Sequence, residues 1–199
     1  MARHRNGSVT PMEGRGRPRF TTAPTLETAR LRLRAHGPDD FAACRAIWSD
    51  PEVVRHIGGK PSTGEEAWRR LLTYAGLWSL LGFGYWAIEE CASGQYIGDI
   101  GYAEFQRDVA PSLHRMLECG WALARAAHGN GYASEALAAI ETWRRTHFPE
   151  SRAVCIIAPE NVASVRVAEK AGLHRWRETA YHGEPTLVFT HAPFPASEA

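Results

Sequence analysis

The spacing of apolar residues along the chain predicts four helices. An apolar stripe with a period near 3.6 runs through four segments, about Pro38–Trp48, Ser62–Trp78, Ala133–Phe148 and Val162–Ala171. Local signals agree with these bounds. Pro38 suits a first helical turn, Ser62–Glu65 and Thr63–Glu66 both have capping-box spacing, and the Asp50–Pro51 pair is expected to end the first helix.

Alternating or continuous apolar runs predict seven strands. These are Leu31–Arg34, Tyr85–Glu89, Tyr96–Tyr102, Met116–Ala124, Ala153–Ile157, Arg175–Tyr181 and Thr186–Thr190. The fully apolar run Ala153–Ile157 is typical of a buried central strand. Gly98 and Gly101 indicate a bulge or a close backbone approach in the third strand. The mixture of helices and strands indicates the α/β class.

Both ends of the chain lack such periodicity. Residues 1–24 are rich in Arg, Gly, Pro and Thr, which predicts a disordered basic tail. Residues 25–192 hold every predicted element and form one domain, as a chain of 199 residues allows. Residues 193–199 are predicted to be a flexible C-terminus.

Composition and charge narrow the functional classes. A formal net charge of +1 gives the whole chain no electrostatic case for nucleic acid or membrane binding, and no apolar run has the length of a membrane span. Its arginine tail leaves salt-sensitive nucleic acid binding as a minor alternative. The four scattered cysteines show no metal-ligand spacing, which predicts reduced buried thiols, no metal and a cytoplasmic location.

The candidate chemistry lies in a glycine loop between a strand and a helix, residues 128–133. His128, Gly129, Asn130, Gly131, Tyr132 and Ala133 follow one another there. Unpaired amides at a helix start attract anions, and glycines let the backbone approach a phosphate closely. Neither the Walker nor the Rossmann spacing fits. On local grounds a tight turn without a ligand stays an alternative.

The glycine loop and the following Ser134–Leu137 resemble the acetyl-CoA-binding motif of the GCN5-related N-acetyltransferases (GNAT), written [Gln/Arg]-x-x-Gly-x-[Gly/Ala]. His128 stands where Gln or Arg is usual. Residues Asn161–Leu173 resemble the second cofactor segment of that superfamily. With Thr28–Arg34 and Glu118–Leu123 they are similar to its RimJ/RimL branch of ribosomal-protein alanine acetyltransferases. The matches extend over about Leu26–Thr190.

This resemblance implies a GNAT fold: a mixed, mostly antiparallel sheet of six or seven strands flanked by four helices. Its two central parallel strands, Met116–Ala124 and Ala153–Ile157, would splay apart. Acetyl-CoA would be the acetyl donor, and a protein N-terminal amine or a small amine the acceptor. The implied cofactor-binding residues are those of the glycine loop together with Trp121, Ala122, Leu123, Ser134, Asn161 and Ser164.

Two catalytic candidates follow. Glu118 is the candidate general base, with binding of the acceptor amine or pairing with an arginine such as Arg115 as alternatives. Ser164 would donate to the leaving thiolate, because Ala168 stands where many members carry a tyrosine. Asn161 and Ser164 are also candidates for local caps of the helix. Glu104 is a second carboxylate for the substrate amine.

Some alternatives stay open. Trp48, Trp68, Trp78 and Trp86 suit either an acceptor pocket or the core. A non-catalytic acyl-CoA-binding module on the same fold is the alternative function. Exposed strand edges near the C-terminus lead us to expect a homodimer.

Overall fold

A mixed sheet of eight strands forms the centre of the part of the chain that the computed structural model describes, residues 20–110 and 112–191. The strand order is β1-β2-β3-β4-β5-β6-β8-β7, and β5–β6 is the only parallel pair of neighbours in it. The predicted mostly antiparallel sheet is therefore confirmed, with the two-residue β1 as an addition. The strands are β1 (Leu26–Glu27), β2 (Leu31–Arg34), β3 (Tyr85–Glu90), β4 (Tyr96–Ala103), β5 (Leu117–Leu123), β6 (Ala153–Ile157), β7 (His174–Tyr181) and β8 (Glu184–Thr190).

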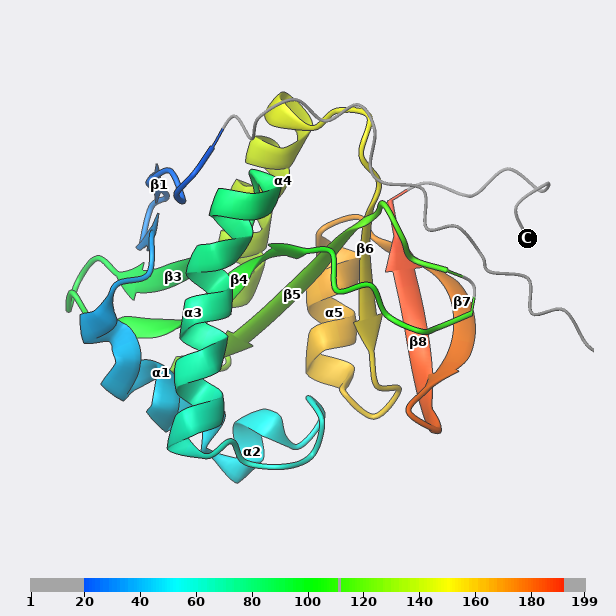
Figure 1. Cartoon of the computed structure of the whole chain (residues 1–199), viewed down its shortest axis with the longest axis horizontal. Helices are drawn as coiled ribbons and strands as arrows, with labels where there is room; N and C mark the ends of the chain where they lie inside the picture. The colour runs from blue at the N-terminus through cyan, green and yellow to red at the C-terminus, as the bar shows by residue number, and fades with distance from the viewer. Residues whose placement is uncertain (1–19, 111, 192–199) are drawn as a thin grey trace, which may run out of the picture.

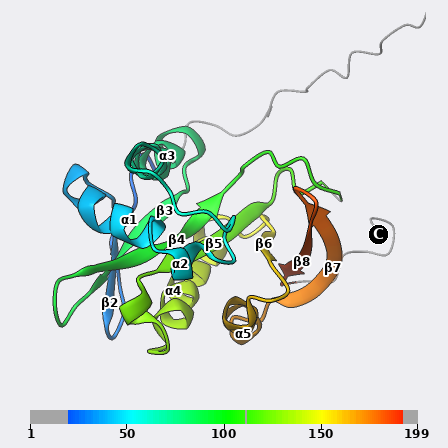
Figure 2. The same cartoon turned by 90° about the horizontal axis from the view of Figure 1, so that it is seen from below.

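Helices cover both faces of this sheet. In Figure 2 the helices α1 (Phe41–Trp48) and α3 (Gly64–Leu81) lie on one face, and α4 (Tyr132–His147) and α5 (Val162–Lys170) on the other. All four predicted helices are present. No helix among the described residues is both long and apolar enough to cross a membrane.

A short fifth helix, α2 (Pro51–Val54), follows α1. The Asp50 side chain accepts the N–H of Glu52 at 2.9 Å, and Pro51 occupies the first turn. The Asp50–Pro51 pair, expected only to end a helix, therefore also begins one. At the start of α3 the capping box is formed by Thr63 and Glu66 rather than by Ser62 and Glu65.

Interlocked indole rings fill the core between α3, α4 and the sheet. The rings of Trp78 and Trp86 lie 4.6 Å apart, and Trp143 lies edge-on to both. Trp78 and Trp86 are thus core residues. The glycines of β4 allow the close approach that the sequence indicated, since a Cβ on Gly101 would lie 2.3 Å from the backbone oxygen of Gly84.

The chain packs against this core upstream of the predicted domain boundary. The ring of Phe20 lies 5.3 Å from that of Trp143, Ala23 is buried, and the Pro24 carbonyl accepts from the Trp86 indole at 2.7 Å. Residues 20–24 thus belong with the domain rather than with the predicted tail. The rest of that tail, residues 1–19, and the predicted flexible C-terminus, residues 193–199, lie outside the described residues.

Candidate active site

The two parallel strands separate soon after they begin. β5 and β6 pair at Leu117–Ala153 and Glu118–Val154, and past these residues they diverge toward their C-terminal ends (Figure 1). A cavity of about 1050 Å³ opens there, with Glu118, Gly120 and Trp121 of β5 in its wall and residues 155–157 of β6 opposite. The predicted splay is confirmed. It leaves backbone groups of both strands without a strand partner, as a ligand with amide groups requires.

The glycine loop follows the end of β5. Gly129 and Gly131 both have a φ of +79°, a left-handed conformation that favours glycine. Gly131 is the N-cap of α4, and the first backbone bond of the helix is donated by Glu135 to Gly131 at 3.1 Å. The N–H groups of Tyr132, Ala133 and Ser134 therefore have no carbonyl partner within the helix, which makes the loop a suitable anion cradle.

Two side chains tie the glycine loop to the sheet. The His128 ring donates from Nε2 to the carbonyl of Leu123 at 2.9 Å, so the unusual first residue of the motif fastens the loop to the end of β5. Arg30 donates to the carbonyl of Asn130 at 3.0 Å and lies over the ring of Tyr132. Glu135 holds Arg30 in turn, with an Nε–Oε2 distance of 2.7 Å. The loop is thus fixed at both ends.

Glu118 lies in the cavity wall and is 7% exposed. Both of its oxygens accept from Arg107, each at 2.7 Å, and Arg107 also donates to the Tyr181 hydroxyl at 2.8 Å. The arginine partner of Glu118 is therefore Arg107 from the β4–β5 connection, and not Arg115. Burial lowers the pKa of the Arg107 guanidinium, and the bonds to Glu118 outweigh this and raise it.

Asn161 and Ser164 line the cavity from the start of α5. The Asn161 side-chain oxygen accepts the backbone N–H of Ser164 at 3.1 Å, so Asn161 caps the helix. This bond uses the amide of Ser164 and the oxygen of Asn161. The Ser164 hydroxyl and the Asn161 amide group are not consumed by it. A cap and a cofactor contact are thus compatible at both residues.

The remaining predicted residues are divided between the cavity and other surroundings. Glu104 accepts the N–H of Arg115 at 3.0 Å and is not among the described residues that line the cavity. Trp48 lines the cavity, whereas Trp68 lies on the surface with 37% exposure.

Sequence reasoning missed several cavity residues, because no spacing signal marks them. His182, to which no role was assigned, is one. Arg55, Arg70, Arg107 and Tyr181 are others.

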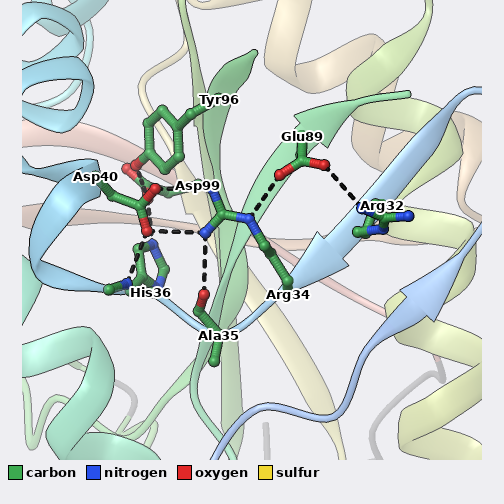
Figure 3. Close-up of polar contacts among 9 residues, drawn as sticks. Arg32, Arg34, Ala35, His36, Asp40, Glu89, Tyr96 and Asp99 are labelled. Carbon is green, nitrogen blue, oxygen red and sulfur yellow. Dashed lines mark hydrogen bonds and ion pairs between the residues drawn. The ribbon is translucent and has the colours of Figure 1, made fainter. Parts of the chain in front are cut away.

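A buried polar cluster supports the cavity wall at Trp48. Asp99 is fully buried and accepts from the Trp48 indole at 2.9 Å, from the Tyr96 hydroxyl, and from His36 Nε2 at 2.7 Å. Figure 3 shows this carboxyl beside His36 and Tyr96. Burial raises the pKa of Tyr96 well above its usual value, and the nearby Asp99 adds to the effect. The Trp48 ring is therefore held in one orientation.

Among the four cysteines, Cys155 lines the cavity. Cys44, Cys119 and Cys155 are buried as predicted, but Cys91 is exposed. Burial raises the pKa of Cys44 to about 12. Within residues 20–110 and 112–191, no group of three or more His, Cys, Asp or Glu side chains is arranged to hold a metal ion.

The fold, with its separated parallel strands and the glycine loop after β5, is that of an acetyltransferase structure. The chain belongs to the GNAT acetyltransferases, since the family model described as "Acetyltransferase (GNAT) domain" matches residues 30–174, more than half of the chain. The assignment as an acetyltransferase enzyme is thereby confirmed.

Individual relatives agree with this family. The chain is 29% identical over 153 residues to a Bacillus subtilis protein described as "Uncharacterized N-acetyltransferase YoaA", covering 76% of this chain and 84% of the relative. A GNAT-family acetyltransferase structure from Bordetella pertussis has a TM-score of 0.75 at 28% identity, covering 85% and 100%. The RimL structure in complex with coenzyme A has a TM-score of 0.69 at 15% identity, covering 85% and 98%, and shares the fold alone.

Proposed function

We propose that this chain transfers acetyl from acetyl-CoA to a primary amine by direct attack in a ternary complex. The observation that supports this most is the gap between β5 and β6. It places Glu118 on one wall of a single cavity and Asn161 and Ser164 on the other, and the glycine loop follows the end of β5. An amine that enters the cavity would meet a thioester held between the strands.

The donor-binding half of the proposal rests on main-chain groups. The free amides of Tyr132, Ala133 and Ser134 bind the pyrophosphate, with His128 and Arg30 fixing the loop around it. The backbone groups of Trp121, Ala122 and Leu123 that do not pair with β4 bind the pantetheine amides, and the Asn161 amide group donates to the same arm. Only glycine has room beside this arm at residue 120, because a Cβ there would lie 2.3 Å from the Tyr85 hydroxyl.

In the chemical step, the amine nitrogen attacks the carbonyl carbon of the thioester, the C–N bond forms and the C–S bond breaks. Glu118 binds the ammonium group of the acceptor and accepts its proton directly or through water. Although Arg107 takes one lone pair on each oxygen, a carboxylate has lone pairs left for a second donor. Ser164 donates a hydrogen bond to the leaving thiolate, which takes up one proton from solvent. Because the ammonium nitrogen loses one proton to Glu118 before the attack and a second to solvent as the amide forms, the overall reaction releases one proton.

The test is a thiol-release assay with acetyl-CoA and a panel of primary amines, comparing the wild type with Glu118→Gln. We expect turnover with some amines and a loss of about 10²-fold or more in kcat for the variant, the usual contribution of a general base. Isothermal titration of CoA on the variant is the control, since the donor half of the site is intact. Clear CoA binding by the wild type without turnover of any amine would favour a non-catalytic acyl-CoA-binding module.

A further inference from the structure

The wall of the cavity opposite the catalytic strands carries excess positive charge. Arg55 and His56 line it from the α2–α3 connection, and Arg69 and Arg70 from α3. Glu66 is the one carboxylate among the described residues of this wall, and it already accepts the N–H of Thr63 at 2.7 Å in the cap of α3. A polycationic acceptor would be repelled here, since like charges raise the free energy of binding.

Arg70 is the best-placed cation of this wall. Its guanidinium carbon lies 3.6 Å from the ring centroid of Trp48, the indole that Asp99 holds in place. No carboxylate in the described part of the chain forms an ion pair with Arg70, whereas Arg69 pairs with Glu65 and Arg107 with Glu118. Stacking on the Trp48 ring thus keeps a planar cation at the wall of the cavity, where it can attract an anion.

One donor of Arg70, the Nε–H group, is also unused by the protein. Its Nε atom is buried and has no hydrogen-bond partner among the described residues. A buried donor without a partner is costly, and a carboxylate bound along the Nε edge of the guanidinium would satisfy it. The side chain has to rotate for this contact, because Nε is covered in the present conformation.

We propose that the acceptor is an amine that also carries a carboxylate, and that Arg70 binds this carboxylate while Glu118 binds the amine. This inference rests on the proposed acetyl transfer and names the class of its acceptor. Both ends of such a molecule find an opposite charge in the same cavity, whose volume of about 1050 Å³ admits a free amino acid or the first residues of a peptide. The carboxylate is therefore either the carboxyl group of a free amino acid or an acidic side chain near the start of a peptide.

The experiment measures kcat/KM for matched acceptors in two arms. The first arm is a series of ω-amino acids of increasing chain length, each against its own amide, which removes the negative charge and keeps the amine. The second arm uses C-terminally amidated peptides with Asp or Asn after the acceptor residue. We expect the charged member to be better by about tenfold or more, the usual effect of a hydrogen bond to a charged group. The arm that shows this ratio identifies the source.

Variants of Arg70 tie the ratio to this side chain. Arg70→Gln is expected to bring the two members of each pair to equal kcat/KM, and Arg70→Lys to leave a smaller preference, since the charge stays but the planar fork is lost. Arg45→Gln is the matched control, because Arg45 is exposed on α1 and does not line the cavity. A thermal melt and a CoA titration on each variant confirm folding.

The outcomes separate the two proposals. Equal kcat/KM for charged and neutral acceptors in the wild type, or a preference for diamines, overturns the role of Arg70 and leaves acetyl transfer intact. An equal loss for both members of each pair in a folded Arg70→Gln variant also overturns it. If no amine in either arm is acetylated while CoA binds, the proposed function itself fails.

Discussion

At the scale of single residues, the capping of α5 and the proposed contacts with the donor use different atoms of Asn161 and Ser164. The Asn161 side chain caps α5 by accepting the backbone N–H of Ser164. Ser164→Ala keeps that N–H, so we expect unchanged stability but a kcat lowered by about tenfold or more, because the thiolate loses a donor. Asn161→Ala removes the cap and should lower the free energy of unfolding by about 1 kcal/mol. Urea unfolding and steady-state kinetics measure the two effects.

Asn161→Asp serves as the control for this pair. Aspartate keeps the side-chain oxygen that caps the helix but loses the amide N–H proposed for the pantetheine arm. It should therefore retain the stability of the wild type while the KM for acetyl-CoA rises. A Ser164→Ala enzyme with wild-type kcat would assign Ser164 to the helix cap alone.

At the scale of elements, a buried ionic cluster joins α4 to the sheet. Glu141 of α4 is 5% exposed and is bonded by the Tyr102 hydroxyl of β4, by Arg144 and by His191 beyond β8. Burial works to raise the pKa of Glu141, but these partners outweigh it and lower the pKa from 4.5 to about 2. The carboxylate thus joins three segments that are distant in sequence.

This lowered pKa predicts a pH dependence of stability. A depressed carboxyl pKa contributes stability that is complete above pH 4.5 and is lost as the pH falls toward 2. For Glu141 that contribution is on the order of 3 kcal/mol. Glu141→Gln should lower the free energy of unfolding by about 3 kcal/mol at neutral pH, because Arg144 is left buried without its partner. Denaturant unfolding at several pH values measures both.

The exposed Glu150→Gln is the control, and it should unfold like the wild type. The Glu141→Gln protein should also lose less stability than the wild type between pH 4.5 and pH 2. Identical pH profiles for the two proteins would show that other carboxylates dominate acid unfolding.

Element prediction from sequence succeeded where local physics decides the outcome. The stripe that ends at Trp78 and the Thr63–Glu66 box define α3 without reference to the rest of the chain. Long-range pairs had no such signal, since nothing near Glu118 or Glu135 in the sequence points to Arg107 or to Arg30, 105 residues away from Glu135. The positively charged wall of the cavity was not predicted for the same reason, because the contact between Arg70 and the Trp48 ring joins two different helices.

At the scale of the whole molecule, the sheet consists of two parts that are joined by a short pairing between β5 and β6. β1–β5 and β6–β8–β7 are antiparallel ladders, and between them β5 and β6 pair at two positions only. The separation of β5 from β6 follows from no local pattern and was inferred from the family resemblance. A ligand that bridges the two parts would therefore stabilise the entire domain.

Binding of CoA should accordingly be visible far from its own contacts. At a concentration 100 times its Kd, a ligand that binds only the folded state raises the free energy of unfolding by about 2.7 kcal/mol. For a domain of this size that is an increase in Tm of about 5–10 °C. Amide hydrogen exchange should slow at Trp121–Leu123 and at residues 155–157, because the pantetheine arm would occupy their free backbone groups. Adenosine 3′,5′-bisphosphate, which lacks the arm, should at equal occupancy slow exchange in both strands less than CoA does. Equal protection by both ligands would mean that the arm does not lie between β5 and β6.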